Sequence, residues 1–134
     1  MNKVSKNHLN MIVEEVKNDS EMLALILFGS TARKDNYKQS DVYICLVLMP
    51  RSFTPKELSQ KKLAYLKSFI LDIQVFQQLP LYIKRRVLKE GKILHCKDDD
   101  ALYDLSFTVI REFADFENIY RDYLVEVWEV ADVR

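Results

Sequence analysis

The feature that most constrains the fold is a short apolar run that ends abruptly at a glycine. Every residue from Met22 to Phe28 is apolar, and Gly29-Ser30 closes the run. A run of this length bounded by turn residues is typical of a strand that is buried on both faces of a sheet. A sheet of this kind is covered by helices, so the run favours an α/β architecture.

Other segments predict the remaining elements of a small mixed sheet with flanking helices. Thr54, Pro55 and Glu57 form a helix-start signal, because Thr54 can cap the helix, Pro55 suits its first turn and Glu57 completes a capping box. Gly91 suits the end of a helix. We expect strands at Asp41–Leu48, Phe69–Phe76 and Lys92–Cys96, and helices at Lys3–Asn18, Pro55–Ser68 and Pro80–Glu90.

The C-terminal part predicts one long helix. After the acidic residues 98–100 the chain has no Pro or Gly up to Arg134, and apolar residues recur at steps of three and four. So wide an apolar face is expected to be buried against something. We therefore expect residues 1–97 to form one domain and residues 98–134 to form a helical extension of it.

Composition excludes several classes of protein. The chain has 134 residues, enough for one core, and its 20 basic residues balance 20 acidic ones, so no strong binding to nucleic acid is expected. Cys45 and Cys96 lack metal-ligand spacing, and Cys45 is expected to be a buried free thiol. No apolar stretch approaches the roughly 20 residues that span a bilayer, and no export signal is visible. We expect a cytoplasmic protein that has no contact with membranes.

The residues with the clearest chemical pattern follow the first strand. Gly29 would let a phosphate approach the backbone, and Ser30 would offer a hydroxyl and an N–H at the start of a helix. Arg33 could steady the same phosphate. Asp41, at the start of the next strand, and Asp72, expected midway along the third, could hold a divalent cation.

Simpler explanations exist for each of these residues. Gly29-Ser30 alone suits a turn at the end of a strand, and Asp41 suits a solvated position at the start of one. Arg33 could equally be an exposed helix residue. The basic run Lys84-Arg85-Arg86 could contact a nucleotide or RNA, or it could be a solvated helix face.

The pattern resembles that of the nucleotidyltransferase superfamily that includes DNA polymerase β. That pattern is Gly-Ser, ten residues, Asp-x-Asp and a third acid on a later strand, and Gly29-Ser30, Asp41 and Asp72 match it in order and spacing. The chain is most similar to the minimal nucleotidyltransferases, in their antitoxin branch. The resemblance implies transfer of a nucleoside monophosphate from ATP or another nucleoside triphosphate with Mg²⁺, and a HEPN-domain RNase toxin as partner.

One position departs from the family pattern. Tyr43 stands where the family has its second aspartate. A phenol is neutral at pH 7 and is a weak ligand for a hard cation such as Mg²⁺. Loss of one acid is expected to slow the reaction by roughly a thousandfold or more. The residue change leaves the expected fold intact and weakens the expected activity.

Three functions follow from these observations. The first is an antitoxin that adenylylates or simply binds a HEPN toxin, with Asp41 and Asp72 as catalytic and metal-binding acids and Gly29, Ser30 and Arg33 as nucleotide-binding residues. The second is an inactive relative that only binds a partner. The third, a transferase acting on a small molecule, usually needs more substrate-binding structure than this chain has. The C-terminal helix could mediate homo- or hetero-oligomers.

Overall fold

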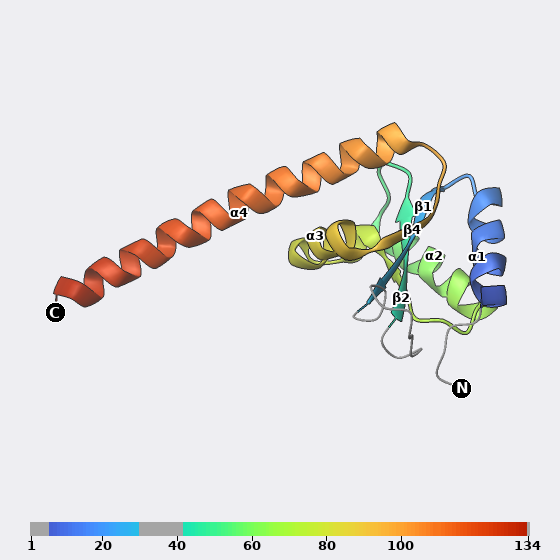
Figure 1. Ribbon diagram of the computed structural model, residues 1–134, viewed down its shortest axis with the longest axis horizontal. Coiled ribbons are helices and arrows are strands. Elements are labelled where there is room, and N and C mark those ends of the chain that lie inside the picture. Colours follow the sequence, from blue (N-terminus) through green and yellow to red (C-terminus); the bar gives the residue numbers. More distant parts are fainter. Residues whose placement is uncertain (1–5, 30–41, 134) are drawn as a thin grey trace.

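The computed structural model describes residues 6–29 and 42–133 (Figure 1). Its elements confirm the expected α/β class and the expected order along the chain. They are α1 (Lys6–Asn18), β1 (Met22–Gly29), β2 (Val42–Leu48), α2 (Pro55–Ser68), β3 (Ile73–Val75), the 3₁₀ turn η2 (Phe76–Gln78), α3 (Leu81–Glu90), β4 (Lys92–Cys96) and α4 (Asp99–Val133).

The four described strands form one mixed sheet in the order β3-β2-β1-β4. β1 is antiparallel to both of its neighbours, whereas β2 and β3 run parallel. At the end of β1, Phe28 pairs with Tyr43 and Gly29 pairs with Val42. The last residues of β1 therefore lie beside the first residues of β2, which is where the sequence predicts a site.

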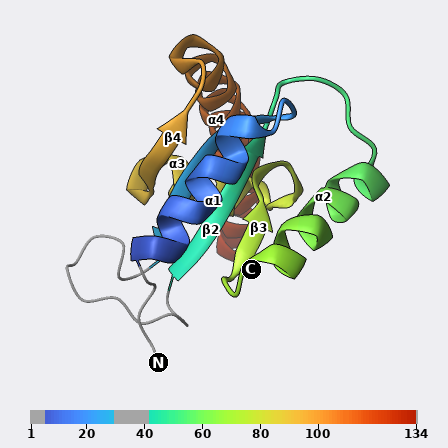
Figure 2. The ribbon, with the colours of Figure 1, turned by 90° about the vertical axis from the view of Figure 1, so that its right-hand side faces the viewer.

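Helices cover both faces of the sheet, as the burial of β1 requires. All eight residues of β1 are buried, and from Ala24 to Phe28 their side chains alternate between two apolar clusters. Leu25 and Leu27 pack with residues of α1 and α2, whereas Ile26 and Phe28 pack with residues of α3 and α4. Figure 2 shows α1 and α2 in front of the sheet and α4 behind it.

The third strand is shorter than expected. The sequence predicts a strand over Phe69–Phe76, but β3 comprises only Ile73–Val75. Phe69 instead ends α2, because its N–H donates to the Tyr65 carbonyl, and Phe76 begins η2. Asp72 consequently precedes β3 and does not lie midway along it. Its carbonyl still accepts the Ile44 N–H at 2.7 Å, which extends the contact with β2.

α4 is the long helix that the sequence predicts, but its apolar face is only partly buried. Leu102 and Val109 are buried against the body, and most of the large apolar side chains after them are exposed. Across residues 6–29 and 42–133, no helix combines the length and the apolar character needed to cross a membrane.

Gly91 follows α3 at a point where three segments converge. A Cβ atom added at Gly91 would lie 2.4 Å from the Val87 carbonyl oxygen and 2.5 Å from Cγ2 of Ile26. The carbonyl belongs to the last turn of α3 and cannot move without disturbing the helix. Gly91 therefore permits close packing of α3 against β1.

We predict that Gly91→Ala destabilises the protein by about 1–3 kcal/mol, as overpacking of a well-filled site does. Urea unfolding followed by circular dichroism measures the change. Lys92→Ala, at an exposed neighbouring position, is the matched control and should change the free energy of unfolding by no more than about 0.5 kcal/mol. Equal stability of Gly91→Ala and the unaltered protein would show that α3 and β1 do not need the glycine for close packing.

A polar cluster around Asp19 ties the turn between α1 and β1 to α2. The Asp19 carboxylate accepts hydrogen bonds from the Tyr65 hydroxyl at 2.9 Å, from the Lys61 ammonium at 3.1 Å and from the Glu21 N–H at 3.0 Å. Lys61 also contacts the Glu21 carboxylate at 2.6 Å. The Lys97 ammonium donates to the Asp19 carbonyl. This cluster fixes where β1 begins relative to α2.

The hydrogen bonds control the protonation of Asp19. Partial burial raises the pKa of Asp19, but the bonds from the Glu21 N–H, Lys61 and Tyr65 outweigh it, so the pKa lies below its ordinary value. Folding thus favours the ionised carboxylate. This contribution to stability is present above the unfolded-state pKa of about 4 and is lost as the pH falls through the lower folded-state pKa.

We predict that Asp19→Asn lowers the free energy of unfolding at pH 7 by about 1.5–3 kcal/mol, the usual size of hydrogen bonds to a charged group. The difference between variant and unaltered protein should shrink as the pH falls below about 4, because the unfolded-state carboxylate then binds a proton, and should vanish below the lower folded-state pKa. Urea titrations between pH 3 and 7 measure this. Glu14→Gln, which removes an exposed ion pair with Lys17, is the control and should cost less than about 1 kcal/mol. A pH-independent difference would contradict the assignment.

Candidate functional site

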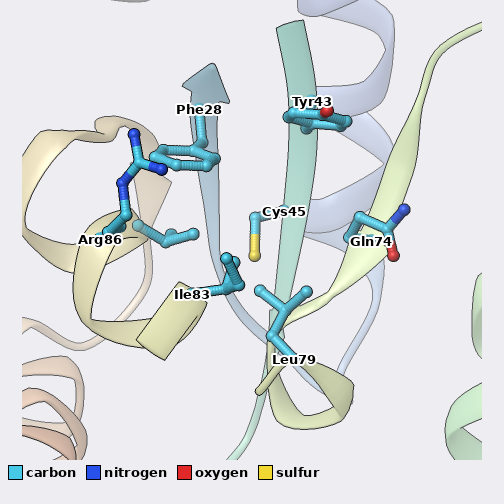
Figure 3. Close-up of a pocket in the computed structure, with 8 residues that line it drawn as sticks. Phe28, Tyr43, Cys45, Gln74, Leu79, Ile83 and Arg86 are labelled. Atoms are coloured by element: carbon cyan, nitrogen blue, oxygen red, sulfur yellow. The ribbon is translucent and has the colours of Figure 1, made fainter. Parts of the chain in front are cut away.

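A pocket of about 400 Å³ opens on the sheet face that α3 covers. Its volume lies in the range of small-molecule sites. Figure 3 shows the side chains that line it, which come from three strands on one side and from α3 and the segment before it on the other. The strands contribute Phe28, Tyr43, Cys45 and Gln74, and the helical side contributes Leu79, Ile83, Arg86 and Val87.

The strand register explains why these side chains meet. Tyr43 and Cys45 are two residues apart on β2, so they point to the same face. Phe28 pairs with Tyr43 across the antiparallel ladder, and Gln74 pairs with Cys45 across the parallel one. The Phe28 and Tyr43 rings stack with centroids 6.2 Å apart and planes inclined by 25°. An aromatic pair therefore forms one end of the pocket.

Arg86 places a positive charge beside this aromatic pair. Its guanidinium carbon lies 5.7 Å from the centroid of the Phe28 ring, in the range of a cation–π contact. The same guanidinium contacts the Glu90 carboxylate at 3.4 Å, one helical turn later. In Figure 3 the Arg86 side chain lies next to Phe28 at the rim of the pocket. A ligand with an aromatic group and negative charge would suit this rim.

The structure places two of the five predicted site residues. Gly29 ends β1 with φ at 152°, a conformation that side chains with a Cβ rarely adopt. Asp72 is exposed just before β3. Extending the pairing of Ile44 with Ile73 by one residue sets Asp72 beside Tyr43. Ser30, Arg33 and Asp41 lie outside the described residues.

The described residues do not form a metal site of their own. Among residues 6–29 and 42–133, no group of three or more His, Cys, Asp or Glu side chains could hold a metal ion. Tyr43, which the sequence pattern predicts to replace the second acid, has a side chain that is 38% exposed and packs on Phe28. Asp72 supplies one carboxylate here. The described residues by themselves do not fit Mg²⁺.

Sequence reasoning missed Phe28, Cys45 and Gln74 as lining residues. The two-residue alternation along β2 could have indicated Cys45, because it follows Tyr43 by two. Gln74 could not be identified in this way, because its position depends on the parallel register between β2 and β3, which no sequence pattern indicates.

The basic run before Gly91 serves separate contacts in the structure. Lys84 lies over the Phe76 ring, Arg85 over the Phe113 ring and Arg86 over the Phe28 ring. Arg86 is the member of the run that lines the pocket. The run is thus not simply a solvated face.

Cys45 lies at the floor of the pocket as the buried free thiol that the sequence predicts. Burial raises its pKa to about 12. Because the thiolate is the nucleophile, we expect Cys45 to react slowly while the protein is folded. Cys96 is only half-buried. Its pKa is also raised, because the effect of burial outweighs that of a backbone hydrogen bond, which lowers it.

We predict that iodoacetamide at pH 8 modifies Cys96 before Cys45, and that Cys45 reacts only when the protein unfolds. Intact-mass measurements on the Cys96→Ser variant isolate the behaviour of Cys45, with the same variant in urea as the positive control. Rapid modification of Cys45 in the folded variant would show that the pocket floor is open to solvent.

Comparison with known proteins identifies the family. The family model described as "Polymerase beta, Nucleotidyltransferase" matches residues 10–100. The chain therefore belongs to the polymerase beta nucleotidyltransferase family. A curated relative, named "Putative protein adenylyltransferase MJ1547", from Methanocaldococcus jannaschii, is 34% identical over 103 residues, which are 77% of this chain and 73% of the relative.

Solved structures show the same fold at lower sequence identity. A chain of a toxin-antitoxin crystal structure with AMP-PNP has a TM-score of 0.63 and 16% identity, and the match covers 92% of this chain and 98% of that one. A chain of the complex of tri-AMPylated Shewanella oneidensis HEPN toxin with MNT antitoxin has a TM-score of 0.60 and 17% identity, with 91% and 97% covered. These likenesses confirm the nucleotidyltransferase fold with its long C-terminal helix.

Proposed function

We propose that this chain is an antitoxin of the nucleotidyltransferase fold that neutralises a HEPN-domain toxin by binding it, with little or no transfer of AMP. One observation carries the second half of the proposal. The Tyr43 ring, stacked on Phe28, occupies the position at which the family pattern has its second acid. The first half is supported by the fold shared with chains from complexes of HEPN toxins and MNT antitoxins.

The loss of the acid is not compensated within the described residues. Extending the β2–β3 register by one residue sets Asp72 beside Tyr43, and no carboxylate lines the pocket in the part of the chain that the structure describes. The stack of Tyr43 on Phe28 also holds an apolar ring where a cation would need a charged oxygen ligand. The chain thus keeps the family fold and the Gly29-Ser30 pattern but lacks one of the acids that would bind the cation.

Nucleotide binding remains part of the proposal. Gly29, Ser30 and Arg33 would contact the phosphates of a nucleoside triphosphate, and Asp41 with Asp72 would be the remaining acids. The pocket supports this assignment, because its aromatic pair suits a base and Arg86 suits a phosphate. In this proposal a bound nucleotide stabilises the chain and is not turned over at a useful rate.

A second candidate is transfer of AMP to the HEPN partner, with ATP and Mg²⁺ as cofactors. The register that sets Asp72 beside Tyr43 favours it, since the third acid of the pattern is retained. The name of the relative that is 34% identical, a protein adenylyltransferase, favours it as well. The two candidates differ in whether Asp41 and Asp72 suffice without an acid at position 43.

We predict that the purified chain, incubated with α-labelled ATP, Mg²⁺ or Mn²⁺ and the HEPN partner, leaves the partner unlabelled. Tyr43→Asp should raise labelling by roughly a thousandfold, because it restores the acid of the family pattern. Tyr43→Asn is the matched control, since it loses the same ring without gaining a charge, and it should remain at the level of the unaltered chain. Urea unfolding of both variants checks that they fold.

The outcomes separate the candidates. Label transferred by the unaltered chain, and lost in Asp41→Asn, would contradict the binding-only proposal and establish the transferase. Absence of a stable complex with the HEPN partner, measured by size-exclusion chromatography, would contradict the binding-only proposal, and absence of both complex and label would contradict both candidates.

A further inference from the structure

α4 consists of a part that packs on the body and a part that extends beyond it. Leu102 and Val109 are buried against the cluster that includes residues of β1 and α3. α4 also contacts α3 at Phe113, where the Arg85 guanidinium carbon lies 4.6 Å from the ring centroid. Beyond this point α4 continues away from the body as a single helix (Figure 1).

The buried face of α4 continues as an exposed aromatic stripe. From Phe113, steps of three, four and three residues lead to Phe116, Tyr120 and Tyr123. We call these last three residues the α4 stripe. The side chains of the stripe are 54–61% exposed, and Phe116 stacks on Tyr120 with centroids 6.2 Å apart. A single helix projecting into water with such a face is marginal without a partner. The stripe therefore has the apolar character of a surface that a second molecule could bury.

Charge is strongly segregated between α4 and the rest of the chain. Asp99–Val133 contains ten acidic residues and two arginines, a net charge of −8. Residues 1–98 contain 17 basic and ten acidic residues, a net charge of +7. The overall neutrality of the protein thus hides an acidic arm on a basic body.

The acidic residues of α4 argue against a second copy of α4 as the molecule that covers the stripe. The steps of three and four along the stripe match the a and d positions of a coiled coil. Glu112 and Glu117 then occupy the flanking g and e positions, which contact the neighbouring helix in such a pair. Two α4 helices packed side by side would bring these like charges together, in addition to the net charge of −8 on each helix. A partner with basic residues beside an apolar surface would be attracted instead.

We propose that the α4 stripe docks the partner protein of the proposed function, on which this inference rests, and that the partner presents an apolar helical surface flanked by Lys or Arg. α4 does not pair with its own copy. The apolar stripe supplies the buried contact, and the flanking acids select a basic partner and orient it. Binding consequently weakens as salt rises.

The experiment measures the affinity of the chain for the HEPN partner by isothermal titration calorimetry. The double variant Phe116→Ala/Tyr120→Ala should raise Kd at least about 30-fold, as loss of two aromatic anchors does. The matched control is Tyr103→Ala/Phe107→Ala, which removes two exposed, stacked aromatic residues from a different face of the same helix and should leave Kd unchanged. Glu112→Lys/Glu117→Lys should raise Kd and reduce its dependence on salt. Circular dichroism confirms equal helix content in all three.

Each outcome bears on a specific claim. Binding by the stripe variant as tight as that of the control overturns the docking inference and leaves the proposed function standing. No binding by the unaltered chain overturns both. Sedimentation of the chain alone should show a monomer, and a dimer that the stripe variant abolishes would instead assign α4 to a second copy and overturn the inference.

Discussion

β1 has no side that faces solvent, and the rest of the structure follows from covering it. All eight of its residues are buried, with a strand on each edge and helices on each face. Burial of apolar side chains on both faces is the largest favourable term available to a chain of this size. The same constraint sets the site, because a strand buried along its whole length presents new chemistry only where it ends, at Phe28 and Gly29.

The fold could largely be predicted from local patterns. The apolar run of β1, the capping box of Thr54 with Glu57 and the unbroken periodicity of α4 are all present in the structure. Local sequence patterns failed to predict the features that depend on contacts between distant parts of the chain. Phe69 and Phe76 look like strand residues, yet one ends α2 and the other begins η2. The Asp19 cluster joins residues more than 40 positions apart, so no sequence pattern indicates it.

The sequence names candidate acids for the site, and the structure adds the side chains that surround the end of β1. The spacing of Gly29-Ser30 and Asp41 needs only the sequence, as does the departure at Tyr43. The consequence of that departure needs the structure, which shows the Tyr43 ring stacked on Phe28 and followed by an apolar floor at Cys45. Among the described residues, the pocket beside the end of β1 offers an aromatic pair and Arg86 to a ligand, and no carboxylate lines it. We infer that the chain retains a family fold that handles nucleotides, while partner binding becomes its main activity.

The most direct test of binding without AMP transfer is the intact mass of the HEPN partner after co-expression with this chain. If the chain only binds, the partner co-purifies as a complex, has its unmodified mass and regains RNase activity once the chain is removed. A partner whose mass is increased by one or more AMP groups, and which stays inactive after separation, would contradict binding without transfer and identify the chain as a working adenylyltransferase.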